Sequence, residues 1–139
     1  RTIPKPEVEQ WRLSLEELIR EFEHGTGIRV DLDWHLPEDL LTAKEKVELT
    51  ACLRESLLNV RKHARGASLV RLTGKAADSG WICTVEDDGR EFDEAALRSP
   101  NRFGVTMMRD RARRMGWSFQ LERKDGRTRA TIRKGGEQT

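Results

Sequence analysis

The spacing of apolar residues in this chain changes repeatedly between the period of a helix and the period of a strand. Apolar residues at helical spacing predict two amphipathic helices, at about Val8–His24 and Ala43–Ala64. The segment "IRVDLDW" (28–34) between them alternates strictly, as a strand does when only one of its faces is buried. Glycines mark the ends of both helices: Gly25, Gly27 and Gly66. The first half of the chain therefore already mixes helices with strands.

Two strong turn signals divide the other strand-like segments into hairpins. The turn "DSG" joins the runs Ser68–Lys75 and Trp81–Glu86, and "DGR" joins "WSFQLERK" to "TRATIRK". Between the hairpins we expect a loop, at about Asp87–Phe103, and a short helix, at about Val105–Met115. The order α-β-α-β-β-loop-α-β-β predicts an α+β fold in two layers, a sandwich of helices on a sheet.

The length of 139 residues fits a single domain spanning 1–139 and is sufficient for a proper core. Lys and Arg number 26 and Asp and Glu number 24, and this balance is too even to predict nucleic-acid binding. The basic run "RDRARR" (109–114) is accordingly interpreted as a solvated helix face. We therefore expect no nucleic-acid partner.

No apolar run approaches the length of a membrane span and no signal-peptide pattern opens the sequence, so we expect no direct membrane contact from this chain. The chain begins with Arg1 rather than Met, which predicts a fragment of a longer protein, whose membrane anchor, where one exists, lies upstream. Cys52 and Cys83 are far apart and the three histidines are scattered, which argues against a zinc site. Two reduced, buried thiols indicate a cytoplasmic location.

The segment "ESLLNVRKHA" (55–64) places an acid, an amide, an ammonium group and an imidazole on one side of the second helix. At about 100° per residue, these four side chains fall within about a quarter-turn. They are Glu55, Asn59, Lys62 and His63. A polar stripe of this kind is by itself more often a solvated face, so its meaning depends on the other motifs of the chain.

Three other motifs are individually weak. The segment "EDDGREF" (86–92) follows a buried strand, where Asp and Gly are common turn residues. The segment "RFGV" (102–105) opens a helix with a glycine that lets backbone N–H groups approach a phosphate. Thr128 lies beside a hairpin turn. Each motif alone fits an ordinary turn or helix start. Their order along the chain after the polar stripe is a more specific signal than any one of them.

This order of motifs resembles the ATP-binding catalytic domain of sensor histidine kinases, in the superfamily that also holds gyrase, Hsp90 and MutL. The resemblance spans about Leu13–Arg133 and is strongest in "ESLLNVRKHA", while "MMRDRARRMG" is similar to the "GxGLxxMRERxxxxGG" stretch of the branch with short catalytic domains. It implies the Bergerat-type ATP-binding fold, a two-layer α/β sandwich whose mixed sheet is covered on one face by about three helices. It also implies ATP as the substrate and Mg²⁺ as the cofactor.

The resemblance gives the polar stripe a chemical role. Asn59 corresponds to the residue whose amide oxygen binds Mg²⁺, a cation that prefers oxygen ligands and keeps several waters. The resemblance gives Asn59 and Glu55 the catalytic roles. Glu55 would orient a metal-bound water or the reacting group. Lys62 would supply a point charge to phosphate oxygens, and His63 would lie against the adenine or the ribose.

The resemblance also assigns the remaining motifs to ATP binding. Asp87 would accept a hydrogen bond from the exocyclic amino group of adenine, where guanine has a carbonyl. Gly89 would let the backbone pass close beneath the purine. Thr128 would place a hydroxyl near Asp87. Gly104 and Val105 would begin a helix whose N-terminus favours the phosphates.

Four positions lack glycines that the family usually has: Glu91, Arg102, Met107 and Arg127. All four lie on the phosphate side of the expected site and around its lid. None of them removes a group that binds the metal or the adenine, so ATP binding is expected. Whether the lid is competent for catalysis is left open.

The resemblance implies a protein histidine kinase that donates the γ-phosphoryl group of Mg-ATP to a histidine on upstream dimerisation helices. The full-length protein would be a homodimer that works with a response regulator. The acceptor lies outside this sequence, since neither His24 nor His35 resembles its motif. Two alternatives remain. One is a degenerate nucleotide-binding or regulatory module with little or no kinase activity, and the other is an anti-sigma-type serine kinase.

Overall fold

The computed structural model describes residues 6–90 and 105–135, with side chains from residue 11 onward within these ranges. The elements, in chain order, are α1 (Pro6–Thr26), β1 (Arg29–His35), the 3-10 helix η1 (Glu38–Leu40), α2 (Ala43–His63), β2 (Leu69–Ala77), β3 (Gly80–Asp87), α4 (Val105–Met115), β4 (Trp117–Lys124) and β5 (Arg127–Lys134). Within the described ranges, the predicted order of helices and strands is confirmed.

Two of the boundaries that differ from the prediction do so for identifiable reasons. α1 continues one residue past Gly25, because Gly27 is the residue that takes the left-handed backbone conformation, with φ of 75°. β3 extends to Asp87, which pairs with Val70 on β2 and with Thr128 on β5 instead of beginning a loop. A strand on each side therefore fixes the backbone of Asp87.

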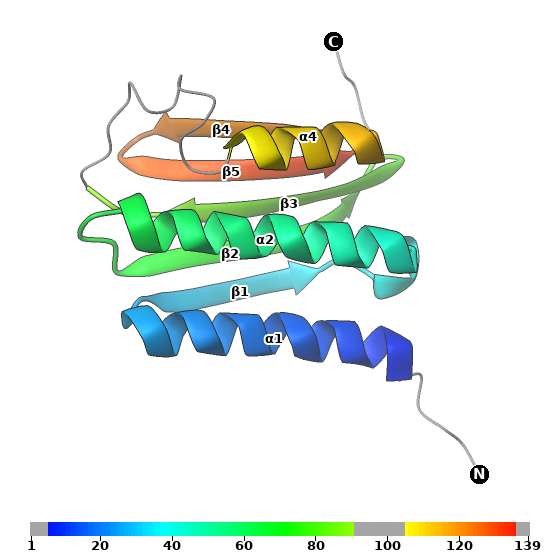
Figure 1. Cartoon of the computed structure of the whole chain (residues 1–139), viewed down its shortest axis with the longest axis horizontal. Coiled ribbons are helices and arrows are strands. Elements are labelled where there is room, and N and C mark those ends of the chain that lie inside the picture. The colour runs from blue at the N-terminus through cyan, green and yellow to red at the C-terminus, as the bar shows by residue number, and fades with distance from the viewer. Residues whose placement is uncertain (1–5, 91–104, 136–139) are drawn as a thin grey trace.

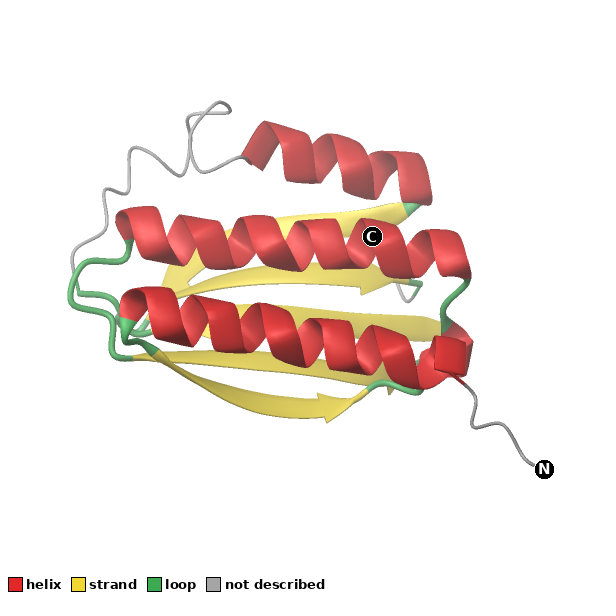
Figure 2. Cartoon of the chain, turned by 60° about the horizontal axis from the view of Figure 1, so that its bottom comes forward, coloured by secondary structure: helices red, strands yellow, loops and turns green. Residues whose placement is uncertain are grey.

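The described strands form a five-stranded sheet in the order β1-β2-β3-β5-β4. β1 and β2 are parallel and the other neighbours are antiparallel, so the sheet is mixed. The three α-helices of the described ranges run side by side along one face of the sheet (Figure 1). Figure 2 shows that they form one layer and the strands the other. The predicted α+β class and two-layer α/β sandwich are confirmed.

Tryptophan side chains join the N-terminal helices to the sheet. Trp11 of α1 donates from Nε1 to Oγ1 of Thr50 on α2 at 2.7 Å, and its ring centroid lies 5.7 Å from that of Trp34 on β1. Trp34 covers its pairing neighbour Gly74 so closely that a Cβ there would lie 2.5 Å from the indole ring. Buried aliphatic residues of α2, β2 and β3 complete the core between the layers: Leu49, Leu53, Leu57, Val60, Val70, Leu72 and Val85.

The uncovered face of the sheet carries a row of alternating charges. The row consists of residues that pair in register across the five described strands: Asp31, Arg71, Glu86, Arg129 and Glu122. Arg71 Nε lies 3.6 Å from Asp31 Oδ2, and Arg129 Nη2 lies 2.7 Å from Glu86 Oε2. Opposite charges that face each other across strands stabilise a sheet. Part of the nearly equal number of acidic and basic side chains is therefore paired within the sheet.

α2 begins with a capping box that is also joined to β5. The hydroxyl oxygen of Thr42 accepts the N–H of Glu45, and Oε1 of Glu45 accepts the N–H of Thr42. The other carboxylate oxygen of Glu45 lies 2.6 Å from Nζ of Lys134. Burial raises the pKa of Glu45, but the hydrogen bonds from Lys134 and Thr42 outweigh burial and leave the pKa below its ordinary value. The ionised carboxylate therefore stabilises the folded state.

We expect Glu45→Gln to lower the free energy of unfolding at neutral pH by about 1–2 kcal/mol, because a charged hydrogen bond is lost while Lys134 stays partly solvated. Glutamine preserves the capping box, so the variant tests the charge pair alone. The folded-state pKa of Glu45 lies below the ordinary 4.5. Its stabilisation is therefore present above that value and is lost as the pH falls through the folded-state pKa. Urea denaturation should show wild type and variant converging in acid, and a constant difference would contradict this account.

Candidate functional site

A pocket opens between the C-terminal half of α2 and the adjoining ends of β3, β4 and β5. The lining is mostly apolar and consists of Ser56, Asn59, Val60, Ala64, Val85, Asp87, Leu121, Thr128 and Ala130. The pocket brings together three predicted site residues from three elements, namely Asn59, Asp87 and Thr128. A concave apolar site with a few convergent polar groups is the usual form of a small-molecule site.

Asp87 is the ionisable residue of this lining and is 5% exposed. Its Oδ1 accepts the backbone N–H of Gly89 at 2.8 Å. Burial raises the pKa of the Asp87 carboxyl, and the hydrogen bond from Gly89 and the charge of Arg123 offset this effect only in part. An ionised carboxylate accepts hydrogen bonds and donates none. The pocket therefore presents a strong acceptor in apolar surroundings, which suits a ligand with an N–H group.

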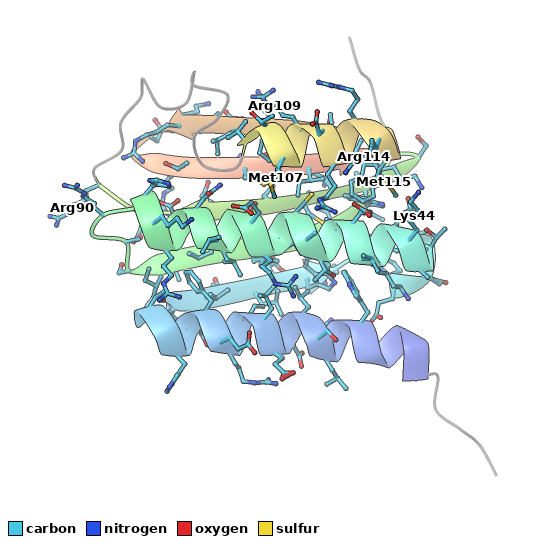
Figure 3. All side chains as sticks on the ribbon, in the orientation of Figure 1. Lys44, Arg90, Met107, Arg109, Arg114 and Met115 are labelled. Atoms are coloured by element: carbon cyan, nitrogen blue, oxygen red, sulfur yellow. The ribbon has the colours of Figure 1, made fainter. Side chains whose placement is uncertain are left out.

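The segment that follows β3 lies directly against the end of α2. A Cβ on Gly89 would lie 2.9 Å from the Cβ of Ala64 and 3.0 Å from Oδ1 of Asp87. The backbone N–H of Arg90 donates to the carbonyl of Arg65 at 2.9 Å. Figure 3 shows Arg90 at this end of the molecule, beside the C-terminal end of α2. The close approach explains why a glycine stands at position 89.

Asp88, the second residue of the acidic pair, has a different environment from Asp87. Its Oδ1 accepts the N–H groups of Ser68 and Leu69 at 2.8 and 3.1 Å, and its Oδ2 accepts the hydroxyl of Ser68 at 2.8 Å. These bonds attach the end of β3 to the start of β2. Asp88 therefore holds the segment in place, while Asp87 lines the pocket.

The structure separates the members of the predicted polar stripe on α2. Asn59 lines the pocket. Glu55 and His63 are half-buried and Lys62 is exposed, and all three lie outside the lining that the described residues form. Their contacts with the reacting group, the base and the phosphates stay predictions.

Two polar residues in or beside the pocket were not predicted from the sequence. Ser56 is buried on α2, where its hydroxyl donates to Sδ of Met108 on α4 at 3.5 Å, and a serine gives no signal before the packing of α4 is known. Arg123 on β4 donates from Nη1 to Oγ1 of Thr128 at 2.8 Å. A signal for Arg123 was present, because the two-residue turn "DG" sets the hairpin register and places Arg123 opposite Thr128.

The N-terminus of α4 supports the wall of the pocket. Val105 begins the helix, as predicted, and is 2% exposed. It packs against Phe119 and Leu121, and Leu121 lines the pocket. A contact between Val105 and a phosphate stays a prediction.

The positions where glycines are replaced are only partly within the described residues. Met107 is 56% exposed on α4, and Arg127 is exposed where it pairs with Lys124 at the hairpin turn. The other residues of this region, Gly104, Glu91 and Arg102, lie outside the described residues. The expectations about the lid are therefore not tested.

No three His, Cys, Asp or Glu side chains of the described ranges are grouped so that they could hold a metal ion. A magnesium ion bound with phosphates does not need such a cluster, because it takes one or two protein ligands and keeps several waters. The amide of Asn59 in the pocket wall fits that set of donors.

Both cysteines are free, and burial raises the pKa of the Cys52 thiol to about 11. A thiol with so high a pKa carries little reactive thiolate. None of the helices in the described parts of the chain combines the length and the apolar character that crossing a membrane requires.

Two curated relatives are named as a sensor and as a signal-transduction kinase. The nitrate/nitrite sensor protein NarX of Escherichia coli strain K12 is 32% identical over 114 residues, which cover 82% of this chain and 19% of NarX. The signal transduction histidine-protein kinase/phosphatase UhpB of Salmonella typhimurium is 32% identical over 120 residues, which cover 86% of this chain and 23% of UhpB. The chain thus spans about a fifth of the length of these relatives. No family model matches the chain.

Solved structures share the fold. The histidine kinase domain of the blue-light activated histidine kinase EL346 of Erythrobacter litoralis has a TM-score of 0.69 at 21% identity, covering 88% of this chain and 59% of that one. The ATP binding domain of PrrB from Mycobacterium tuberculosis has a TM-score of 0.61 at 19% identity, covering 88% of this chain and 94% of that one. The chain is therefore a homologue of the sensor histidine kinases of two-component systems, and it has the fold of their ATP-binding catalytic domains.

Proposed function

We propose that this chain is the ATP-binding half of a sensor histidine kinase and that its pocket holds the adenine of Mg-ATP. The observation that carries the proposal is the placement of Asp87 and Thr128 on the sheet side of an apolar pocket whose helix side carries Asn59. In the full-length homodimer, the chain would donate the γ-phosphoryl group to a histidine on dimerisation helices outside this sequence. A response regulator would then receive it, in the cytoplasm.

The lining of the pocket suits a purine base. α2 contributes apolar surface on one side, and β3, β4 and β5 contribute it on the other, so a flat ring bound between them would be withdrawn from water. The carboxylate of Asp87 would then accept a hydrogen bond from the amino group of adenine. Guanine would turn a carbonyl oxygen toward the same carboxylate, and two facing acceptors in a buried site are costly. The pocket should therefore prefer ATP over GTP.

The polar side chains of α2 would act on the phosphates. Asn59 would hold Mg²⁺ through a neutral amide oxygen, and the bound ion would neutralise charge on the phosphate oxygens. Lys62, one turn further along α2, is exposed and could bring its ammonium group to the same phosphates. Glu55, one turn before Asn59, would orient the reacting group. Since phosphoryl transfer depends mainly on positioning and charge neutralisation, these residues are sufficient on the donor side.

The two alternative functions have less support. A regulatory module without nucleotide has no need for a carboxylate buried in an apolar pocket, because such a group destabilises the fold when it is ionised. A serine kinase of the same superfamily would bind ATP in the same way. The similarity of this chain to UhpB, whose name describes a histidine-protein kinase, supports a histidine rather than a serine as the acceptor.

The metal assignment predicts that Mg²⁺ strengthens the binding of an ATP analogue to the wild-type chain and that Asn59→Ala abolishes this difference. Calorimetric titrations with Mg²⁺ and with EDTA would measure it. Val47→Ala is the control on the same helix, because Val47 is 65% exposed and lies outside the pocket lining, so its variant should keep the metal dependence. Asn59→Ala binding that still responds fully to Mg²⁺ would refute the assignment.

Asp87→Asn should have opposite effects on binding and on stability. ATP affinity should fall by one to two decades, or about 1.5–3 kcal/mol, because a charge-assisted hydrogen bond is weakened. Because the folded-state pKa of Asp87 lies above its ordinary value, the ionised carboxylate destabilises the free chain at neutral pH. The variant should therefore melt at the same or a higher temperature without nucleotide.

Asp88→Asn provides the matched control for Asp87→Asn. Its carboxylate accepts three hydrogen bonds outside the pocket, so this variant should lose stability and keep its ATP affinity. Calorimetry and thermal melting of both variants separate the two roles. Wild-type chain that binds GTP as tightly as ATP would show that Asp87 does not read adenine.

A further inference from the structure

Arg123 lies in the same row of the sheet as the proposed base-reading residue. The turn residues Asp125 and Gly126 both have positive φ, at 55° and 75°, and the hairpin they close pairs Arg123 with Thr128. Thr128 pairs in turn with Asp87. The row Arg123–Thr128–Asp87 therefore crosses β4, β5 and β3, and its last two members line the pocket.

The guanidinium group of Arg123 connects two separate parts of the pocket wall. Its Nη1 donates to Oγ1 of Thr128 at 2.8 Å. Its Nη2 donates to the backbone carbonyls of Gly89 and Arg90, at 2.9 and 3.2 Å. The planar fork of an arginine can hold a side chain on one side and a backbone on the other at the same time, whereas a lysine presents a single point charge.

These contacts constrain the groups that face a ligand. Because the oxygen of Thr128 accepts from Arg123, the hydroxyl hydrogen of Thr128 is directed away from the guanidinium group and can donate to a group in the pocket. The bond to the carbonyl of Gly89 holds the same residue whose N–H donates to Asp87 Oδ1. The positive charge of Arg123 also lowers the pKa of Asp87, against the larger effect of burial.

We propose that Arg123 is a positioning residue for base recognition, which orients the Thr128 hydroxyl and holds the Asp87–Arg90 segment against the β4–β5 hairpin. This inference rests on the proposed function, in which Asp87 reads adenine. Arg123 does not itself line the pocket, so it acts through Thr128 and Gly89.

Arg129 is the matched control for Arg123. It lies one residue beyond Thr128 on β5, and its guanidinium group binds Glu86 at 2.7 Å, on the uncovered face of the sheet. Arg129 therefore ties β5 to β3 as a structural contact away from the pocket. Replacing it removes a positive charge and a strand-to-strand bond without touching the base-reading groups.

The test is calorimetric titration of ATP and of GTP into the wild-type chain and its variants Arg123→Met, Arg123→Lys and Arg129→Met. We expect Arg123→Met to weaken ATP binding about tenfold, which corresponds to one charge-assisted hydrogen bond, and to lower the ratio of ATP to GTP affinity. The ATP affinity of Arg123→Lys should lie between those of Arg123→Met and the wild type. Arg129→Met should keep the wild-type ratio. Amide hydrogen exchange at Gly89 in the free chain should accelerate in Arg123→Met alone.

An unchanged ATP to GTP ratio in folded Arg123→Met would overturn the inference, as would an equal fall in Arg129→Met. Should Arg123→Met fail to fold, Arg123→Lys carries the test, and wild-type affinity and selectivity in that variant would also overturn it. If the wild-type chain binds ATP and GTP equally well, the proposed function itself is wrong. The role of Arg123 in base recognition then falls with it, whatever happens to the exchange of Gly89.

Discussion

The site depends on one close approach, that of the segment after β3 to the C-terminal end of α2. Position 89 has no room for a side chain between Ala64 and the carboxylate of Asp87. With glycine at this position, the backbone N–H of Gly89 donates to Asp87, and the end of α2 packs close enough to form one wall of the pocket. The carboxylate is thereby buried at a cost in free energy that its partners offset only in part. A buried carboxylate that destabilises the free protein and faces an apolar pocket is a candidate for ligand binding.

The two faces of the sheet contribute differently to the structure. The covered face carries the core and, where β3 ends, the row that leads from Arg123 through Thr128 to Asp87. The uncovered face carries the row of alternating charges that runs from Asp31 to Glu122. Pairing these charges across strands adds stability on the face away from the pocket. The sheet thus holds the groups proposed to read the base at fixed positions relative to one another.

Most of the fold follows from local patterns in the sequence, because the periods of the helices and strands and the two hairpin turns are local properties. Asp87 and Thr128 could be linked in advance only through a family resemblance, since their pairing joins strands that are far apart in the chain. Ser56 shows what periodicity misses: it lies beside the polar stripe around α2, next to the direction of His63, and is nevertheless buried. Whether a helix face is open or covered is decided by the neighbouring helix, and no pattern within α2 records where α4 packs.

The role proposed for the pocket between α2 and β3 is to hold adenine through Asp87. A crystal structure of the chain with Mg²⁺ and a non-hydrolysable ATP analogue tests it most directly. The base should lie between α2 and the sheet, with its amino group within hydrogen-bonding distance of the Asp87 carboxylate and the metal on the amide oxygen of Asn59. A nucleotide bound elsewhere on the chain, or a base in this pocket whose amino group faces away from Asp87, would contradict it.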